Sequence, residues 1–474
     1  MFAKINNFSN DEKENQQMER ATQLGQEKVS KLLMKFSLPA IVGMLVNALY
    51  NVVDRIFIGN GVGSLGIAGI TICFPIMIVL MAFGMLIGIG ANSLISIRLG
   101  QGRKEDAELI MGNAFVLLVL SAIILSTLGL TFLDPFLKFF GASAAVLPYA
   151  RDYLSIILLG AVFQSIGFGM NNFIRAEGNP TIAMMTMLIG AVLNTVFDPI
   201  FIFAFGWGIR GAAAATIFSQ MVASGWVLSY FLSKRSSLRL HWKNLRLKVM
   251  VIIQIVTIGA APFSVQLASS VLNAILNNNL TRYGGDIAVS GMGVIMSIMM
   301  LIMMPVIGIS QGAQPIIGYN YGARQFKRVK DTLKLAVVAA TVFVSIGYIG
   351  IMFFPHLLIS LFNPNDEKLI AFGVHAIRTF MIFLPIIGFQ IVGANYFQAV
   401  GKPKQSMFLS LSRQVLILIP LLLILPKYLN LQGVLIAGPI ADLASSIITG
   451  LFLRYELGRL HRKDKAEYEL NPQY

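Results

Sequence analysis

The stretch SLPAIVGMLVNALYNVVDRIFIG, residues 37–59, indicates the fold class, because it is predominantly apolar over the length of a membrane span. An α-helix rises about 1.5 Å per residue, so this stretch is long enough to cross a hydrocarbon core of about 30 Å. Stretches of the same kind recur along the whole chain. We therefore expect an all-α membrane protein.

Composition excludes several other classes of protein. Charged residues make up 12% of the 474 positions and hydrophobic residues 56%, and the mean hydropathy is +0.73, whereas soluble domains carry about a quarter charged residues. The net charge of +15 does not indicate nucleic-acid binding, because the Lys and Arg residues lie between apolar segments. Cys73 is the only cysteine, which excludes an intramolecular disulfide and argues against a metal cluster.

The hydropathy pattern predicts twelve transmembrane helices. Residues 1–31 have no apolar core of the kind that a signal peptide needs, so we interpret them as a solvated tail. The expected spans are 36–59, 66–97, 107–133, 150–175, 181–205, 211–233, 250–280, 288–320, 332–354, 369–399, 405–425 and 433–454.

The distribution of basic residues predicts the orientation of these spans. The two tails and the loops on their side hold 28 Lys and Arg residues, and the alternate loops hold six. Cytoplasmic loops are the ones rich in Lys and Arg. We expect a multi-pass protein of the cell (inner or plasma) membrane with both termini in the cytoplasm.

The two halves of the chain repeat with a shift near 222 residues. LGQGRKEDAE (99–108) matches NYGARQFKRV (320–329), and RAEGNP (175–180) matches QAVGKP (398–403). Six spans return the chain to its starting side, so the repeats predict two pseudo-symmetric six-helix bundles with a cavity between them at mid-membrane depth. The expected parts are a cytoplasmic tail (1–31), an N-terminal lobe (32–233), a cytoplasmic linker (234–249), a C-terminal lobe (250–455) and a second tail (456–474).

Three acidic residues, Asp54, Asp198 and Asp442, fall inside apolar spans. A charged group at that depth costs at least about 2.5 kcal/mol, so such residues usually face a cavity or a partner. Asp54 and Asp198 are at matching depths, Asn194 lies one helical turn from Asp198, and Thr216 is at a similar depth. An oxygen-rich cluster of this kind is suited to binding a proton or Na⁺, the only metal ion we expect.

Structural interpretations of these acidic residues remain open. Asp54 precedes Arg55 and forms, on this reading, an interfacial ion pair. Asp198 precedes Pro199 and accepts hydrogen bonds that a proline kink frees. Asp442 and Arg413 lie at similar depth, and we expect a buried charge pair in the C-terminal lobe with a structural role.

Other polar and thioether side chains are candidates for the substrate cavity. Ser270, Asn273 and Asn277 are spaced three and four apart and form one stripe on the seventh span. Methionines crowd the eighth span, and thioethers adapt to apolar ligands of varied shape. Helix packing explains either pattern as well. The candidates are Gln164, Asn172, Gln266, Ser270, Asn273, Asn277, Met296 and Met300.

The sequence resembles the multidrug and toxic compound extrusion (MATE) family, in its MepA-like and DinF-like branch. The motifs are SLPAIVGMLVNALYNVVDRIFIG (37–59), RAEGNP (175–180), LNTVFDPIFIF (193–203) and GIRGAAAAT (208–216), and similarity covers nearly all of 32–455. The resemblance implies a V-shaped pair of six-helix lobes that exports drugs in exchange for H⁺ or Na⁺. By motif match, it implies a cation site at Asp54, Asn171, Asn194, Asp198 and Thr216.

A multidrug antiporter is therefore the function that we expect, and a flippase for lipid-linked precursors is the alternative. The sequence has no phosphate-binding loop and no catalytic histidine motif, so we expect neither an enzyme nor a cofactor. A flippase for large anionic headgroups would need several Arg or Lys residues in its cavity. The expected partners are small amphipathic, often cationic compounds and the lipid bilayer, with no nucleic acid, and the expected state is a monomer.

Overall fold

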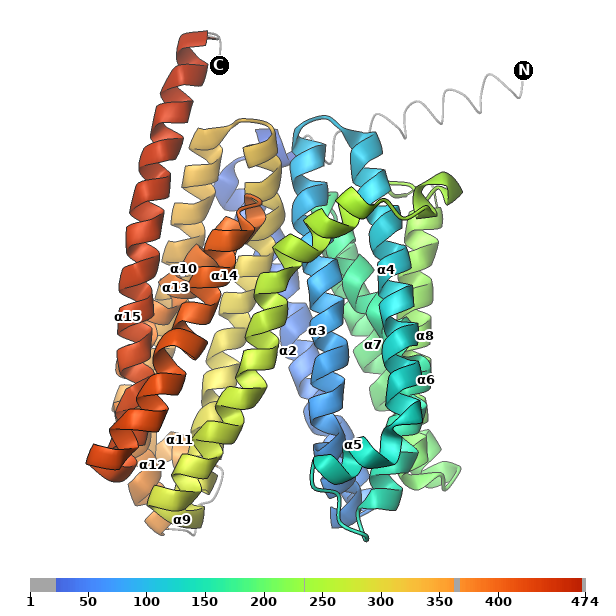
Figure 1. Ribbon diagram of the computed structural model, residues 1–474, viewed down its shortest axis with the longest axis vertical. Coiled ribbons are helices and arrows are strands. Elements are labelled where there is room, and N and C mark those ends of the chain that lie inside the picture. The colour runs from blue at the N-terminus through green and yellow to red at the C-terminus, as the bar shows by residue number, and fades with distance from the viewer. Residues whose placement is uncertain (1–22, 234, 362–366, 471–474) are drawn as a thin grey trace. The chain divides into compact units, whose positions relative to one another are not determined.

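The computed structural model describes residues 23–233, 235–361 and 367–470, and their regular structure is helical (Figure 1). The N-terminal tail up to residue 22 and the last four residues lie outside these ranges. The principal elements are α2 (Val29–Gly61), α3 (Ser64–Gly100), α4 (Lys104–Thr131), α5 (Leu133–Phe139), α6 (Leu147–Ala176), α7 (Pro180–Pro199), η1 (Ile200–Ala204), α8 (Gly208–Leu232), η2 (Trp242–Leu245), α9 (Val249–Gly322), α10 (Phe326–Phe353), α11 (Pro355–Ser360), α12 (Glu367–Phe380), α13 (Leu384–Ala399), α14 (Pro403–Leu411), η3 (Ser412–Leu418) and α15 (Ile419–Leu470).

The helices of the described chain follow the apolar spans expected from the sequence. Ten stretches of the described chain are long and apolar enough to cross a membrane, and the bent pair α12 and α13 makes an eleventh. The last stretch, Pro403–Arg462, has 60 residues and is interrupted at Asn430, where φ is 49°. At about 1.5 Å per residue it is long enough to cross twice. The protein is therefore an all-helical, multi-pass membrane protein.

The tenth span differs from the continuous helix that we expected over 369–399. It is broken between α12 and α13, which meet at an angle of 50°. Pro385 lies in the first turn of α13, where its missing N–H costs no helical hydrogen bond. The residue before a proline also avoids helical geometry, which places the break just before this point.

The chain forms two compact units whose boundaries fall inside helices. The first unit is built mainly from Val42–Phe263, and the second from Lys28–Ile41 together with the chain from Ser264 onward. The beginning of α2 thus belongs to the second unit, and the beginning of α9 to the first. The boundaries that we expected, at residues 233 and 250, lie at the end of α8 and in the first turn of α9.

Glycines permit close backbone contacts where the beginnings of α2 and α9 pack against the unit to which they belong. In the first unit, a Cβ on Gly259 of α9 would lie 1.7 Å from the Leu86 carbonyl oxygen of α3. In the second unit, a Cβ on Gly312 of α9 would lie 2.7 Å from the Ser37 backbone nitrogen of α2. The repeat relates the second contact to one between α3 and α9, because Gly312 and Ser37 correspond to Gly90 and Gly259 at a shift of 222 residues. A Cβ on Gly90 would lie 3.1 Å from the Gly259 backbone nitrogen.

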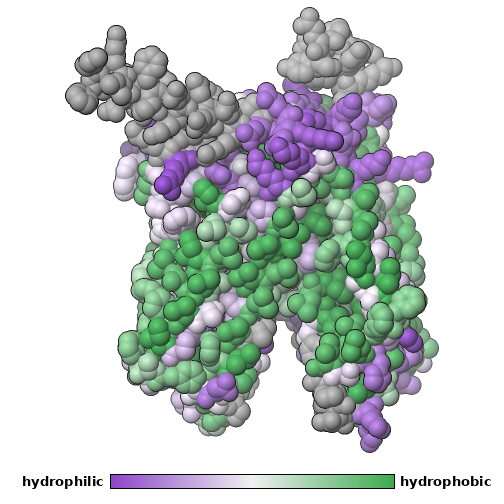
Figure 2. Space-filling model, turned by 180° about the vertical axis from the view of Figure 1, so that it is seen from behind, coloured by the Kyte–Doolittle hydropathy of each residue, from purple (hydrophilic) through white to green (hydrophobic). Residues whose placement is uncertain are grey.

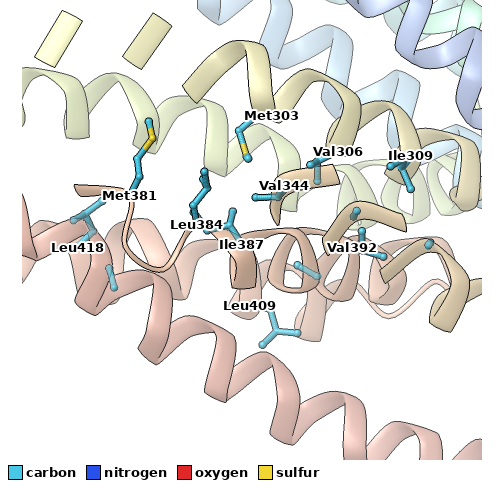
Figure 3. Packing of buried hydrophobic residues seen from close by; sticks show 14 of the residues in the cluster. Met303, Val306, Ile309, Val344, Met381, Leu384, Ile387, Val392, Leu409 and Leu418 are labelled. Atoms are coloured by element: carbon cyan, nitrogen blue, oxygen red, sulfur yellow. The ribbon is translucent and has the colours of Figure 1, made fainter. Parts of the chain in front are cut away.

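Each unit has its own apolar core and an apolar outer surface. Buried residues of α9, α10 and α13 meet in the second unit, with Met303, Val344 and Ile387 among them (Figure 3). Hydrophobic residues cover the middle of each unit's surface, and hydrophilic ones gather mainly toward one end (Figure 2). This pattern is the one that a bilayer requires of a spanning protein.

The segment that we interpreted as the linker is fastened to the first unit. Asn113 of α4 donates to the carbonyl of Asn244 (3.1 Å) and accepts from the backbone N–H of Lys248 (2.7 Å). The carboxylate of Glu177, in the loop after α6, accepts from the hydroxyls of Tyr230 and Ser236. These contacts fix the approach of the chain to α9.

Candidate cation site

A cluster of buried polar side chains lies in the first unit, close to one end of its helices. Asp54 of α2 is 8% exposed, Asp198 of α7 is 0%, and Thr216 of α8 is 8%. Asp54 and Asp198 are seven and six residues from the ends of their helical segments at Gly61 and Ala204, and Thr216 is eight from the start of α8. All three are therefore about 9–12 Å from the helix ends on one side. We call this side, where α2 ends, the far side.

Hydrogen bonds join three residues of this cluster, and Asp54 lies beside them. The Asn194 amide Nδ2 lies 3.3 Å from Asp198 Oδ1 and 3.3 Å from Thr216 Oγ1. The carboxyl groups of Asp54 and Asp198 are close enough to share a hydrogen bond. Asp54, Asn194, Asp198 and Thr216, which the sequence placed at one depth, are thus brought together from three helices.

Three oxygen atoms of the cluster are buried without a hydrogen-bond partner among the described residues: Asp54 Oδ1, Asn194 Oδ1 and Asp198 Oδ2. Leaving a buried acceptor unsatisfied costs about 1–3 kcal/mol, and more for charged groups. A small hard cation could be coordinated by all three, because carboxylate and amide oxygens are the ligands that such cations take, whereas a proton could be shared by two of them.

The structural interpretations of the two acidic residues fit this geometry less well. Arg55 is exposed, whereas Asp54 is buried, and no ion pair joins the two within the described chain. Pro199 is followed by η1, a π-helical segment, yet Asp198 Oδ1 accepts from the side chain of Asn194. Such π-helical segments occur frequently at functional sites.

The other side chain that the resemblance placed in the site, Asn171, lies elsewhere. Its amide donates to the carbonyl of Ala183 (2.7 Å), and its oxygen accepts from Arg175 (2.5 Å). These contacts tie α6 to the beginning of α7, near the other end of both helices. Asn171 is therefore separated from the carboxylates by much of the membrane thickness.

Sequence reasoning missed a tyrosine in the cluster. Tyr153 of α6 is 3% exposed and lies close enough to both Asp54 and Asp198 to interact with them electrostatically. It is 18 residues from Asn171, or about 27 Å along the helix. Tyr153 is six residues from the start of α6, and this depth matches that of Asp198. The matching depth could have identified Tyr153 as a member of the cluster.

The candidate cavity residues fall into exposed and buried groups. Asn273, Asn277 and Met300 are exposed, and Gln164, Gln266 and Ser270 are half-buried. Met296 packs against the apolar core of the second unit. Asn172 is buried, and its amide donates to the carbonyl of Phe168 at 3.0 Å.

Asp442, the acidic residue inside an apolar span of the C-terminal half, contacts Arg413, which the sequence predicted as its partner. Arg413 Nε lies 2.5 Å from Asp442 Oδ1, and the two side chains are 20% and 5% exposed. The neighbouring Gln414 is hydrogen bonded to Ser269 of α9 at 3.1 Å. No group of three or more His, Cys, Asp or Glu side chains among the described residues could hold a metal ion.

Comparisons with known proteins agree with this architecture. The chain is 29% identical over 447 residues to the multidrug export protein MepA of Staphylococcus saprophyticus, covering 93% of this chain and 96% of the relative. It is 28% identical over 441 residues to MepA of Staphylococcus haemolyticus, with the same coverage. These relatives are exporters rather than enzymes.

Solved structures show the same fold. An outward-facing multidrug resistance MATE family transporter of the MOP superfamily matches with a TM-score of 0.88 and 26% identity over 94% of this chain and 99% of that chain. A MOP superfamily transporter from Pyrococcus furiosus matches with a TM-score of 0.87 and 26% identity, over 93% and 99%. The MatE family model matches residues 39–200 and 262–424, one block in each half. The chain therefore belongs to the MatE family.

Proposed function

We propose that this protein exports amphipathic, drug-like organic compounds in exchange for H⁺ or Na⁺, and that Asp54, Asn194, Asp198 and Thr216 bind the coupling cation. The observation that carries the proposal is that this one cluster holds three unpartnered buried oxygens, on Asp54, Asn194 and Asp198. The export of drugs is supported by the staphylococcal relatives, which are multidrug export proteins.

The orientation that we propose places both termini in the cytoplasm and the far side outside the cell. The excess of Lys and Arg in the loops on the tail side supports it. The two carboxylates of the cation site are then within about 12 Å of the outer ends of their helices. A cation entering from outside reaches it by a short path, and its inward movement gains about 2.3 kcal/mol per 100 mV of membrane potential.

The substrate side of the exchange rests on the exposed polar groups of α9. Asn273 and Asn277 are exposed within a membrane span, and amide groups need water or a ligand rather than acyl chains as neighbours. Met300 offers an exposed, adaptable apolar contact to a compound bound nearby. Binding of the cation favours the conformation from which the compound has been released, so the cation and the compound move in opposite directions.

Proteoliposomes with imposed gradients test this proposal. Wild-type protein should export ethidium when either a proton or a sodium gradient is imposed, and Asp54→Asn or Asp198→Asn should lower the rate to the level of empty vesicles. The matched control is Asp152→Asn, since Asp152 pairs with Arg210 at the protein surface (2.9 Å). Ion-coupled export by Asp54→Asn at the wild-type rate would reject the assignment, and movement of a fluorescent lipid-linked precursor instead of ethidium would favour the flippase.

A further inference from the structure

A groove of about 480 Å³ in the second unit lies between α10, α12 and α15. Its lining combines one cationic side chain, Arg378, with a largely apolar wall; the other lining residues are Tyr348, Met352, Thr379, Ile382, Phe383, Ile436, Pro439 and Ile440. The volume falls within the range of small-molecule sites, about 300–1,000 Å³. The groove is formed where α12 breaks before α13.

The groove opens onto a surface suited to lipid. On α10, Ile346 and Ile349 are 64% and 53% exposed, and on α15, Leu443 and Ile447 are 40% and 56% exposed. These side chains flank the lining residues of their own helices by one or two turns. Apolar side chains exposed in this way on spanning helices face acyl chains.

The charged end of the groove is at headgroup depth. The guanidinium of Arg378 donates to the carbonyl of Met352 at 3.0 Å. Leu335 follows the last basic residue in the first turns of α10, and Met352 comes 17 residues later. This separation is about 26 Å, close to the hydrocarbon thickness of about 30 Å. The guanidinium therefore lies near the far-side boundary between acyl chains and headgroups.

The Arg378 guanidinium can bind an anion, because no carboxylate among the described residues neutralises its charge. Two other arginines on the far side pair with carboxylates: Arg151 with Asp134 (3.3 Å) and Arg210 with Asp152 (2.9 Å). Arg378 is bonded to a neutral carbonyl and to no carboxylate among the described residues. A guanidinium presents several donors in a fork that matches a phosphate group.

We propose that this groove binds one anionic phospholipid of the far-side leaflet, with its phosphate on Arg378 and one acyl chain along Ile382, Phe383 and Ile440. The positive charge of Arg378 favours a phosphate group. The apolar wall, which opens toward lipid, favours a ligand whose phosphate carries an acyl chain. This site is separate from the cation cluster, which belongs to the first unit, and does not depend on the proposed transport function.

Native mass spectrometry of the delipidated protein, titrated with phosphatidylglycerol, tests the proposal. Wild type should retain one lipid more tightly than the rest. Arg378→Gln should weaken this binding by about tenfold, the loss expected for one charged hydrogen-bonding group. Ile440→Trp, which fills the groove, should weaken it similarly. Arg282→Gln is the matched control, since Arg282 lies over the ring of Tyr283 (5.5 Å) and does not line the groove.

A photoactivatable phosphatidylglycerol locates the bound lipid in proteoliposomes. Crosslinks should fall on peptides that contain Tyr348, Met352 or Ile382. The proposal is wrong if Arg378→Gln and Ile440→Trp both bind the lipid within twofold of wild type, or if the crosslinks map to other helices. Binding of inorganic phosphate that depends on Arg378, without binding of the lipid, would also overturn it. Should Arg378→Gln not fold, Ile440→Trp and the crosslinks decide alone.

Discussion

Asn194 Nδ2 lies 3.3 Å from Thr216 Oγ1, and this contact links α7 to α8 beside the paired carboxyl groups of Asp54 and Asp198. The same amide nitrogen lies 3.3 Å from Asp198 Oδ1. Since the amide donates on this side, its own oxygen remains available and is unpartnered in the structure. Asn194 therefore organises the cluster by its N–H groups and offers an acceptor to a cation.

The hydroxyl of Thr216 should set the affinity for the cation. Thr216→Val keeps the shape of the side chain but removes the acceptor of the Asn194 amide, so the half-saturating cation concentration for efflux should rise by about tenfold, or about 1.4 kcal/mol. Thr216→Ser keeps the hydroxyl and should stay near wild type. Equal half-saturating concentrations for the Val and Ser variants would show that the hydroxyl takes no part.

The pair Arg413 and Asp442 should contribute to stability rather than to ion coupling. Arg413→Gln strands a carboxylate that is 5% exposed, and breaking such a buried pair costs about 3–5 kcal/mol. The thermal midpoint in detergent should therefore fall, and the double variant Arg413→Gln with Asp442→Asn should recover part of the loss. If Asp442→Asn alone abolished ion-driven efflux at an unchanged thermal midpoint, the residue would belong to a coupling site.

Glu177 should make the stability of the first unit depend on pH. Burial raises the pKa of the Glu177 carboxyl above its ordinary value of 4.5. The folded state then holds a proton that the unfolded state releases, so this contribution to stability is complete below pH 4.5 and is lost as the pH rises through the folded pKa. Thermal midpoints measured in detergent from pH 4 upward should show this decline.

Substitution of Glu177 separates its titration from its hydrogen bonds. Glu177→Gln should remove the pH-dependent decline. It should also lower the thermal midpoint, because one carboxyl oxygen becomes an NH2 donor, so that either the Tyr230 hydroxyl or the Ser236 hydroxyl and the Ser237 backbone N–H lose their acceptor; each lost partner costs about 1–3 kcal/mol. Glu105→Gln, at an exposed residue, should leave both features unchanged. An unaltered pH profile in Glu177→Gln would assign the decline to another group.

The close contact of α3 and α9 in the first unit should not tolerate a methyl group. In Gly259→Ala the new Cβ would meet the Leu86 carbonyl oxygen, a backbone atom, and overpacking of this kind costs about 1–3 kcal/mol. The thermal midpoint should fall. Gly225→Ala on α8, where nothing lies within 4 Å of the added Cβ, should be neutral or stabilising, since Ala favours a helix by up to about 1 kcal/mol. Equal thermal midpoints for the two variants would show that α3 and α9 can move apart to accept a methyl group without loss of stability.

The sequence predicted the spans well because each apolar stretch must match the thickness of the bilayer. Ten stretches of the described chain, or eleven with the bent pair broken at Met381–Phe383, are long and apolar enough to cross a membrane. Pro385 was the local signal for that break, but an uninterrupted hydropathy plot concealed it. Which helices pack together could not be predicted in the same way. The first part of α2 belongs to the second unit and the first part of α9 to the first unit, and this depends on side-chain packing, which a hydropathy plot does not contain.

The candidate site was predictable where charge and depth carried information. Asp54 and Asp198 stand out because carboxylates are costly in an apolar span, and the helical rise placed them at one level. Tyr153 was overlooked, since a tyrosine is unremarkable by composition in a membrane helix. Asn171 was included by motif alone, and the same depth reasoning applied to α6 would have excluded it.

Direct binding of the cation to the purified protein tests the central claim, that Asp54 and Asp198 together hold the coupling ion. Protons taken up on acidification and radioactive sodium bound at equilibrium are counted for wild type, Asp54→Asn, Asp198→Asn and the control Asp152→Asn. We predict saturable binding of H⁺ or Na⁺ in wild type and Asp152→Asn, and its loss in each of the other two variants. Binding of wild-type affinity and stoichiometry in a protein that carries both Asp54→Asn and Asp198→Asn would contradict the claim.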